Sequence, residues 1–204
     1  MKKYIVIYNK NSRGKTYSKQ DLEMIFSSHD LDSKIFVTNE IKQVDKIVKN
    51  FKNSKDYVYC AIGGDGTLNS LINALLGNNI NNPEVACIAS GSGSDFMRTF
   101  AMPVDIHQAI SRIKNNQNYS IDASFVESKT KSRYFINVLN YGFLAETVNL
   151  SEKLPNIFKR FRYPISFWLK LFTGKQSLFN LKTNTYEFNK KAFNVSICNG
   201  QFFG

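Results

Sequence analysis

Apolar residues in the first half of the chain fall into short unbroken runs that are separated by stretches with helical spacing. The runs predict buried strands at residues 4–9, 35–38, 57–62 and 85–89. The stretches between and after them predict helices at residues 18–28, 41–51, 68–76, 95–100 and 106–113. Strands that alternate with helices are typical of a doubly wound, mostly parallel α/β sheet. We therefore expect such a sheet in this half of the molecule.

The same pattern predicts where some helices begin and which side they bury. Ser18 precedes the first predicted helix, and its hydroxyl oxygen can accept a hydrogen bond from an N–H group of the first turn. In the helix at 41–51, helical spacing places Ile41, Val44, either Ile47 or Val48, and Phe51 on one face. We expect this face to pack on the sheet.

The pattern changes near residue 120, where predicted strands become more frequent. Residues 120–126 and 134–138 predict two strands, and the polar link at 129–133 predicts a hairpin between them. The remaining predicted elements are helices at residues 145–150 and 165–172 and strands at residues 181–186 and 192–198. We expect two domains, an α/β domain at residues 1–120 and a partial, β-sandwich-like domain at residues 121–204.

The charge of the chain favours an anionic partner. The net charge is +11, from 27 basic and 16 acidic residues. Such an excess suits nucleic acid, an acidic membrane surface or a phosphorylated small molecule. Charge alone does not choose among these, and a surface with many solvated lysines would give the same composition.

Cysteine and histidine usage gives no sign of a metal site or of a disulfide framework. The spacing of Cys60, Cys87 and Cys198 fits no zinc pattern, and their odd number argues against paired disulfides. We expect them to be small buried hydrophobic residues in a reducing compartment. His29 and His107 are isolated in the sequence. No apolar run approaches the roughly 18 residues that span a bilayer, so we expect a soluble, cytoplasmic protein.

Residues 153–186 form a basic and aromatic stretch that contains no acidic residue. Cations and aromatic rings together suit the interface of an anionic membrane. The same mixture could bind single-stranded nucleic acid by stacking. An ordinary helix that packs its aromatic residues on the second domain would also explain it.

The sequence Gly-Gly-Asp-Gly-Thr-Leu-Asn at residues 63–69 connects a predicted strand to a predicted helix. Glycines let backbone N–H groups approach a ligand closely, and a helix N-terminus carries partial positive charge, so this turn suits phosphate. Three roles stay open for Asp65: ordering the loop, holding a metal ion through water, or accepting a proton from a substrate hydroxyl. A tight turn without a ligand is the plain alternative.

A second glycine turn, Ser-Gly-Ser-Gly-Ser-Asp-Phe at residues 90–96, also follows a predicted strand and precedes a predicted helix. Its glycines alternate with serines, so backbone and hydroxyl groups can both face a polyanion. Neither turn has the spacing of a dinucleotide-binding fingerprint or of a P-loop. In open parallel sheets, ligands bind outside the carboxyl ends of the strands, where both turns are expected.

With these turns, the chain resembles the diacylglycerol kinase catalytic-domain family, which includes bacterial lipid kinases and sphingosine kinases. The segments that resemble family motifs lie at residues 9–15, 63–67, 91–96, 121–122, 135–143 and 199–204. The resemblance implies an N-terminal domain like that of NAD kinases and phosphofructokinases. It also implies an ATP-dependent kinase that uses Mg2+ to phosphorylate a lipid hydroxyl, such as that of diacylglycerol.

The resemblance also implies roles for individual residues. The residues expected to bind the nucleotide are Asn9, Lys15, Thr38, Gly63, Gly64, Asp65, Gly66, Thr67, Leu68, Asn69, Gly91, Ser92 and Gly93. Asp65, Asp95 and Asp122 are expected to organise magnesium, and Asp65 is also the candidate catalytic base. The implied partners are ATP, a lipid substrate and an acidic membrane surface bound peripherally. Nucleic acid is not expected, and a homodimer is left open.

The chain departs from the family pattern at several positions. Lys10, Arg13, Ser70 and Ser94 stand where the family usually has proline, glycine, glutamate and asparagine. The family pattern continues beyond the last matching segment, so we expect a fragment or truncated product with impaired activity. Two rival functions stay open: a kinase of a soluble substrate, and a non-catalytic module that binds nucleotide or lipid.

Overall fold

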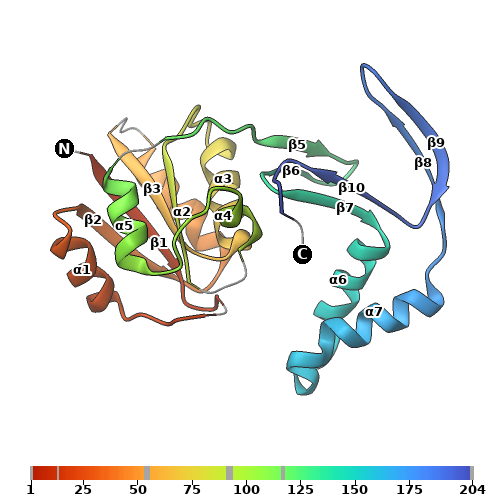
Figure 1. Ribbon diagram of the computed structural model, residues 1–204, viewed down its shortest axis with the longest axis horizontal. Coiled ribbons are helices and arrows are strands. Elements are labelled where there is room, and N and C mark those ends of the chain that lie inside the picture. The colour runs from red at the N-terminus through yellow and green to blue at the C-terminus, as the bar shows by residue number, and fades with distance from the viewer. Residues whose placement is uncertain (1, 13, 53–55, 91–93, 116–117, 203–204) are drawn as a thin grey trace. The chain divides into compact units, whose positions relative to one another are not determined.

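The computed structural model describes residues 2–12, 14–52, 56–90, 94–115 and 118–202. The chain divides into two units, labelled by element in Figure 1. The first unit comprises the residues up to Asn137 together with the segment from Asn199 onward, and the second is Val138–Cys198. Each unit is described separately below.

The first unit is built on a four-stranded parallel sheet. Its strands are β1 (Lys3–Asn9), β2 (Asp32–Thr38), β3 (Tyr57–Gly63) and β4 (Val85–Ala89), in the order β2-β1-β3-β4. In the register, Asn9 pairs with Thr38, and Gly63 pairs with Ala89. The predicted doubly wound, mostly parallel sheet is therefore confirmed.

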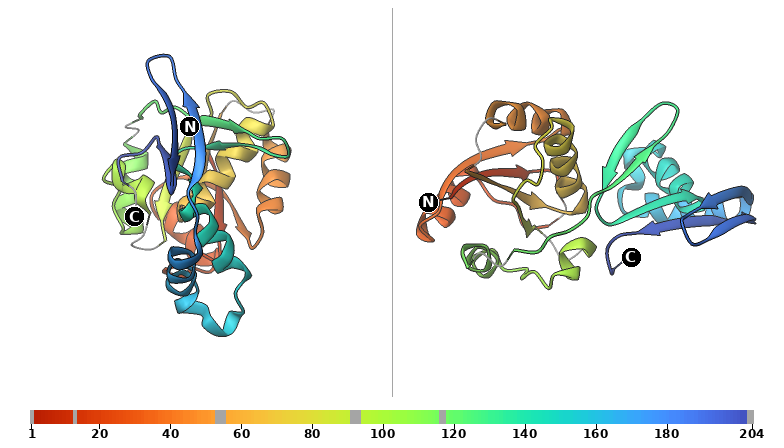
Figure 2. Two further views of the ribbon diagram at one scale, coloured as in Figure 1. Left: turned by 90° about the vertical axis from the view of Figure 1, so that its right-hand side faces the viewer. Right: turned by 90° about the horizontal axis from the view of Figure 1, so that it is seen from above.

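Helices cover both faces of this sheet, as Figures 1 and 2 show. One face carries α1 (Lys19–Ser28) and α5 (Ile106–Lys114), and the other carries α2 (Ile41–Phe51) and α3 (Asp65–Gly77). The short helix α4 (Asp95–Thr99) follows the second glycine turn. Successive side chains of β1 and β3 point alternately into the core on one face of the sheet and the core on the other. Both sets of side chains are buried, so these central strands are unbroken apolar runs.

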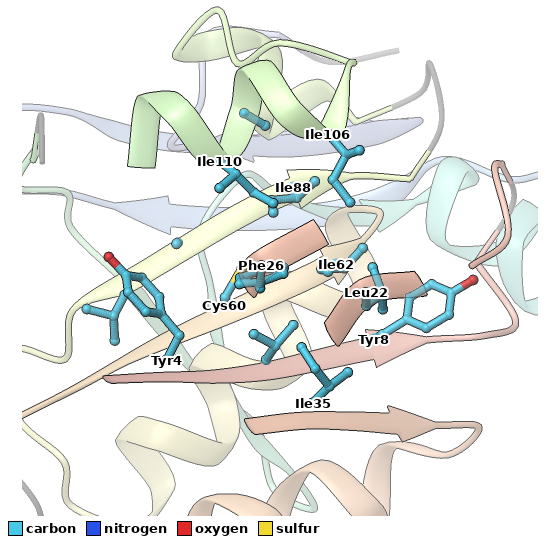
Figure 3. Close-up of a cluster of buried hydrophobic side chains, with 14 residues drawn as sticks. Tyr4, Tyr8, Leu22, Phe26, Ile35, Cys60, Ile62, Ile88, Ile106 and Ile110 are labelled. Carbon is cyan, nitrogen blue, oxygen red and sulfur yellow. The ribbon is translucent and has the colours of Figure 1, made fainter. Parts of the chain in front are cut away.

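Figure 3 shows the core between the sheet and the helices α1 and α5. Leu22 and Phe26 of α1 and Ile110 of α5 pack against strand residues such as Ile62 and Ile88. All five side chains are almost completely removed from solvent. Burial of this kind supplies most of the favourable free energy of folding.

Two predictions about helices have different outcomes. Ser18 caps α1 as predicted, because its hydroxyl accepts a hydrogen bond from Asp21 N at 3.0 Å, and Asp21 Oδ2 accepts one from Ser18 N at 2.9 Å. The helix α2 has the predicted bounds, and Val44 is buried. The prediction that Ile41 faces the core is wrong, since its side chain is 66% exposed in the first turn of α2.

A hairpin extends the first unit beyond the boundary near residue 120 that the sequence suggests. Strands β5 (Ser124–Glu127) and β6 (Ser132–Phe135) are antiparallel, and β6 packs on α3. The Asn73 side chain of α3 bonds both backbone groups of Tyr134, with Nδ2 to O and N to Oδ1 each at 2.9 Å. An amide side chain thereby fastens the hairpin to the helix.

The second unit contains helices and two-stranded antiparallel sheets. Its elements are β7 (Val138–Gly142), α6 (Phe143–Lys153), the 3-10 helix η1 (Asn156–Phe161), α7 (Arg162–Thr173), β8 (Ser177–Lys182), β9 (Glu187–Ala192) and β10 (Asn194–Cys198). β7 pairs with β10, and β8 pairs with β9. The predicted strand at 181–186 is partly wrong, because Thr183 N donates to Tyr186 O at 2.7 Å and closes a turn there. Within the described ranges, no helix has the length and apolar character needed to cross a membrane.

Candidate active site

A cleft of about 810 Å³ opens in the first unit at the carboxyl ends of the parallel strands. This size falls within the range of roughly 300–1,000 Å³ that is usual for small-molecule sites. Six of the residues predicted to bind nucleotide line it: Asn9, Thr38, Gly63, Gly64, Gly66 and Thr67. The first glycine turn is thus at the position where open parallel sheets bind ligands.

The glycines of the first turn have two different structural roles. A Cβ atom added to Gly63 would overlap the side chain of Thr67, so this glycine is required by packing. A Cβ atom added to Gly64 or Gly66 would meet no atom within 4 Å, because both positions border open space. Gly64 is also the N-cap of α3, and among the described residues this helix end has no side-chain cap. The turn therefore presents an uncapped helix N-terminus to the cleft, a favourable place for an anion.

Hydrogen bonds tie the loop after β1 to its neighbours around the cleft. Asn9 Nδ2 donates to Thr67 Oγ1 at 3.2 Å, and Lys10 N donates to Thr38 O at 3.1 Å. The hydroxyls of Ser12 and Ser90 are 2.8 Å apart. These bonds link the ends of β1, β2 and β4 with the first turn of α3, so the polar groups of the cleft are held in place.

Asp65 binds the start of α4 and does not line the cleft. Its carboxylate accepts a hydrogen bond from the Ser94 hydroxyl, one from Asp95 N at 3.1 Å and one from Phe96 N at 3.3 Å. Because an acidic side chain is favourable at a helix N-terminus, this arrangement connects the two glycine turns. Ser94, at the position where the related family has asparagine, provides one of the three donors.

The three carboxylates predicted to organise magnesium have different surroundings. Asp95 lies 3.3 Å from Arg98 in an ion pair, and the backbone oxygen of Asp122 accepts a hydrogen bond from Asn199 Nδ2 at 2.7 Å. Across the part of the chain that the structure describes, no three His, Cys, Asp or Glu residues come together to hold a metal ion. Magnesium commonly needs only one or two carboxylates besides water and substrate phosphates.

Three further described residues that were predicted to bind nucleotide, Lys15, Leu68 and Asn69, are not part of the cleft lining. Lys15 Nζ is 5.5 Å from the centre of the Tyr17 ring, a cation–π arrangement outside the cleft lining. Leu68 is 2% exposed and belongs to the core under α3. In the amide orientation that gives both ends a partner, Asn69 donates to Tyr134 O at 3.2 Å and accepts from the Arg133 guanidinium at 3.3 Å. Gly91, Ser92 and Gly93 lie outside the described residues.

Nine residues that line the cleft are not among those predicted to bind nucleotide: Ser12, Gly14, Asn39, Glu40, Ile41, Val44, Ser70, Ser94 and Arg133. Ser12, Ile41 and Arg133 illustrate the reasons. Ser12 belongs to a loop segment that was recognised, but its hydroxyl carried no signal of its own. Ile41 was assigned to the core because its helical spacing matched. Arg133 was assigned to a hairpin link, and only the packing of β6 on α3 brings it to the cleft.

The cysteines and histidines lie outside the cleft lining. Cys60 is buried and Cys87 half-buried, as expected of small hydrophobic residues, but Cys198 is exposed, so that prediction is wrong for it. Burial, together with the nearby Asp65 carboxylate, raises the pKa of the Cys87 thiol to about 12, which keeps it protonated and unreactive. His29 and His107, isolated in the sequence, are neighbours in space, with Nε2 and Nδ1 3.1 Å apart.

Comparisons with known proteins give matches to one family. The sequence model of the family described as diacylglycerol kinase catalytic domain matches residues 3–126. A diacylglycerol kinase of Staphylococcus saprophyticus is 29% identical over 171 residues, which are 82% of this chain and 53% of that protein. A diacylglycerol kinase of Staphylococcus aureus strain Newman is 28% identical over 170 residues, 82% of this chain and 51% of that protein.

A solved structure of a diacylglycerol kinase from Bacillus anthracis shares the fold. Its TM-score is 0.65 at 22% identity, and the match covers 98% of this chain and 65% of that one. The chain spans about half the length of the curated relatives it matches.

Proposed function

Because the chain belongs to the diacylglycerol kinase catalytic domain family, we propose that it transfers the terminal phosphoryl group of ATP to the hydroxyl of a lipid such as diacylglycerol. The observation that carries the proposal is the uncapped N-terminus of α3, which opens on the cleft between two glycines that border open space. Phosphoryl transfer depends mainly on positioning and on charge neutralisation, and a helix N-terminus contributes to both.

The cleft offers different surroundings for the two ends of ATP. Polar groups gather around the start of α3, where Gly64, Gly66 and Thr67 would meet the phosphates. Ile41 and Val44, at the start of α2, supply apolar surface for the base. Thr38 lies between these regions, and its hydroxyl is already oriented, because it donates to Tyr8 O at 3.3 Å. ATP would therefore lie across the ends of β1 to β3.

Of the roles open to Asp65, its hydrogen bonds favour ordering the site. Its carboxylate is held at the start of α4 by bonds from Ser94, Asp95 and Phe96, and it lies outside the cleft lining, so a substrate hydroxyl would not meet it directly. Asp65 and Asp95 would hold magnesium through water, and the ion would neutralise phosphate charge. In this proposal Asp65 fixes α4 and the second glycine turn beside the nucleotide.

The proposed lipid substrate gives a role to the second unit. On η1 and α7, Phe161 is 66% exposed, Trp168 is 57% exposed and Phe172 is 81% exposed. Lys153 and Lys175 flank these elements and are exposed. Exposed aromatic rings flanked by cations suit the headgroup region of an anionic membrane, so we place peripheral membrane contact on this surface. The exposure of these rings argues against the ordinary core helix that the sequence left open.

The test is transfer of labelled phosphate from ATP, with magnesium, to diacylglycerol in micelles that contain acidic phospholipid. Formation of phosphatidic acid supports the proposal. ATP binding without transfer to any lipid would favour the non-catalytic module, and transfer only to a soluble hydroxyl compound would favour the rival kinase. A protein that binds no ATP under conditions where it is folded would overturn the proposal.

A further inference from the structure

One cation lines the cleft among the residues that the structure describes. Of the lining residues, only Glu40 and Arg133 are charged, and the rest are neutral. The phosphates of a nucleotide carry several negative charges, which a helix N-terminus of about half a charge balances only in part. A side chain that adds a full positive charge at this place would change affinity strongly.

Lys15, the lysine that the sequence suggested for phosphate, is not in this position. Its ammonium group lies against the face of the Tyr17 ring, at 5.5 Å from the ring centre. Lys15 is absent from the described residues that line the cleft. The structure therefore separates the predicted cation from the open space beside α3.

Arg133 is brought to this space by contacts with α3. Asn69 and Asn73 are one helical turn apart and lie on one side of α3. The Asn73 side chain makes two hydrogen bonds of 2.9 Å with the backbone of Tyr134, and these bonds fix the position of β6 along the helix. In the amide orientation that gives both of its ends a hydrogen-bond partner, Asn69 then accepts a hydrogen bond from the guanidinium of Arg133 at 3.3 Å.

We propose that Arg133 is the phosphate-binding cation of the cleft and that Asn69 and Asn73 are the residues that position it. The inference rests on the proposed function, because it assumes that a nucleotide occupies the cleft. Arg133 lies beside Asn69, one turn along α3 from its first residue Asp65, and it shares the cleft lining with Gly66, Thr67 and Ser70. It therefore contacts the phosphates at the end where transfer takes place, and not the base.

Arginine suits this position for geometric reasons. A guanidinium group has five N–H donors in a planar fork, so one can bond Asn69 while others bond two phosphate oxygens. A lysine would offer a point charge without this division of donors. We therefore expect Arg133→Lys to retain only part of the affinity.

The experiment compares binding of four ligands by calorimetry: ATP, ADP, adenosine and inorganic tripolyphosphate. Arg133→Gln is the test variant, and Lys131→Gln is the matched control, because it removes the same charge from an exposed residue of the same hairpin outside the cleft lining. Loss of a charged hydrogen bond predicts roughly 10- to 100-fold weaker binding of ATP and tripolyphosphate by Arg133→Gln. Adenosine binding should not change, and Lys131→Gln should alter ATP binding by less than about threefold.

The outcomes separate this inference from the function on which it rests. Equal ATP affinity in Arg133→Gln and in the unmodified protein would overturn the inference alone. Equal losses for adenosine and ATP would also overturn it, since they would show that Arg133 only supports the fold. If the unmodified protein binds neither ATP nor tripolyphosphate, the proposed function and the inference both fail. A thermal melt of each variant checks that the hairpin stays folded.

Asn73 gives a second readout of the positioning role. Asn73→Asp keeps the size of the side chain but replaces the amide donor that bonds Tyr134 O. If the asparagines set the position of Arg133, this variant should weaken ATP binding several-fold while adenosine binding is retained. Combined with Arg133→Gln it should add no further loss, because the two changes then act on one contact. Full additivity in this double variant would contradict the positioning role.

Discussion

The two units of this protein use their apolar residues in opposite ways. The first unit buries large aliphatic and aromatic side chains on both faces of its sheet. In the second unit, the described side chains that are fully buried are the hydroxyl residues Thr147 and Ser166, while Trp168 and Phe172 are exposed. The difference teaches that the first unit has its own source of stability. The apolar surface of the second unit, by contrast, is available to a partner.

The sequence explains this difference locally. The central strands β1 and β3 are unbroken apolar runs, which match a sheet that is covered on both faces. On α7, by contrast, apolar residues occupy several sides of the helix, and Trp168, Leu169 and Phe172 are all exposed. The apolar side chains of such a helix are removed from water only when the helix contacts another protein surface or a membrane.

The largest expected effect tests the buried side of this comparison. Leu71 on α3 is fully buried, so Leu71→Ala should lower the free energy of unfolding by about 2–5 kcal/mol. Phe172→Ala, at a position that is 81% exposed, should change it by less than about 0.5 kcal/mol. Chemical denaturation of both variants measures the two values. Similar losses would show that the second unit is as tightly packed as the first.

The next effect concerns the ligand site of the first unit. Gly64→Ala adds a methyl group to the open space of the cleft and should leave the melting temperature nearly unchanged. It should weaken ATP binding by about 10- to 100-fold, because the methyl group blocks charged hydrogen bonds at the N-terminus of α3. Gly77→Ala, at the other end of the same helix and also facing open space, is the control. It should retain ATP binding and increase stability by up to about 1 kcal/mol.

A smaller effect tests the exposed side of the comparison. Trp168→Ser on α7 should lower the affinity for vesicles of acidic phospholipid by about tenfold, since a large side chain no longer enters the interface. Met24→Ser is the control, because Met24 is 63% exposed on α1 of the first unit. Sedimentation with vesicles measures both. If Met24→Ser reduced vesicle binding as strongly, membrane contact would not be specific to the second unit.

The smallest effect concerns the link between the two glycine turns. Ser94→Ala removes one donor from the Asp65 carboxylate, and a net loss of about 1–2 kcal/mol in the free energy of unfolding is expected. Ser94→Asn, which restores a donor at this position, should recover most of that loss. Thermal or chemical unfolding gives both values, and a Ser94→Ala variant as stable as the unmodified protein would show that Asp65 does not depend on this bond.

Local sequence patterns predicted the first unit well for a physical reason. Helix α2 has the predicted bounds and β1 is nearly as predicted, because periodic burial on a regular sheet leaves a periodic sequence. The strand predicted at 181–186 was partly wrong, since the hydroxyl of Thr183 and the turn at Tyr186 compete with strand pairing there.

The sequence predicted which backbone turns form the site but not all of the side chains that line it. Glycine turns between strands and helices are visible in sequence, and they indicated where a ligand could lie. The lining by Ile41 and Arg133 was not visible, because it depends on which helix face meets the cleft and on where a distant hairpin packs. Lys15 is the opposite example: the sequence suggested it for phosphate binding, but its ammonium group lies against the Tyr17 ring.

The overlap between Gly63 and Thr67 also restricts how this site can evolve. A Cβ atom at position 63 would come within 2.7 Å of the Cβ atom of Thr67, so even alanine at position 67 would not make room for it. A side chain at position 63 therefore requires residue 67, or the backbone around it, to move. Loss of the Thr67 hydroxyl would remove the contact between Asn9 and Thr67 that ties the loop after β1 to α3. Each single substitution is therefore expected to be destabilising, and the two positions are expected to change together.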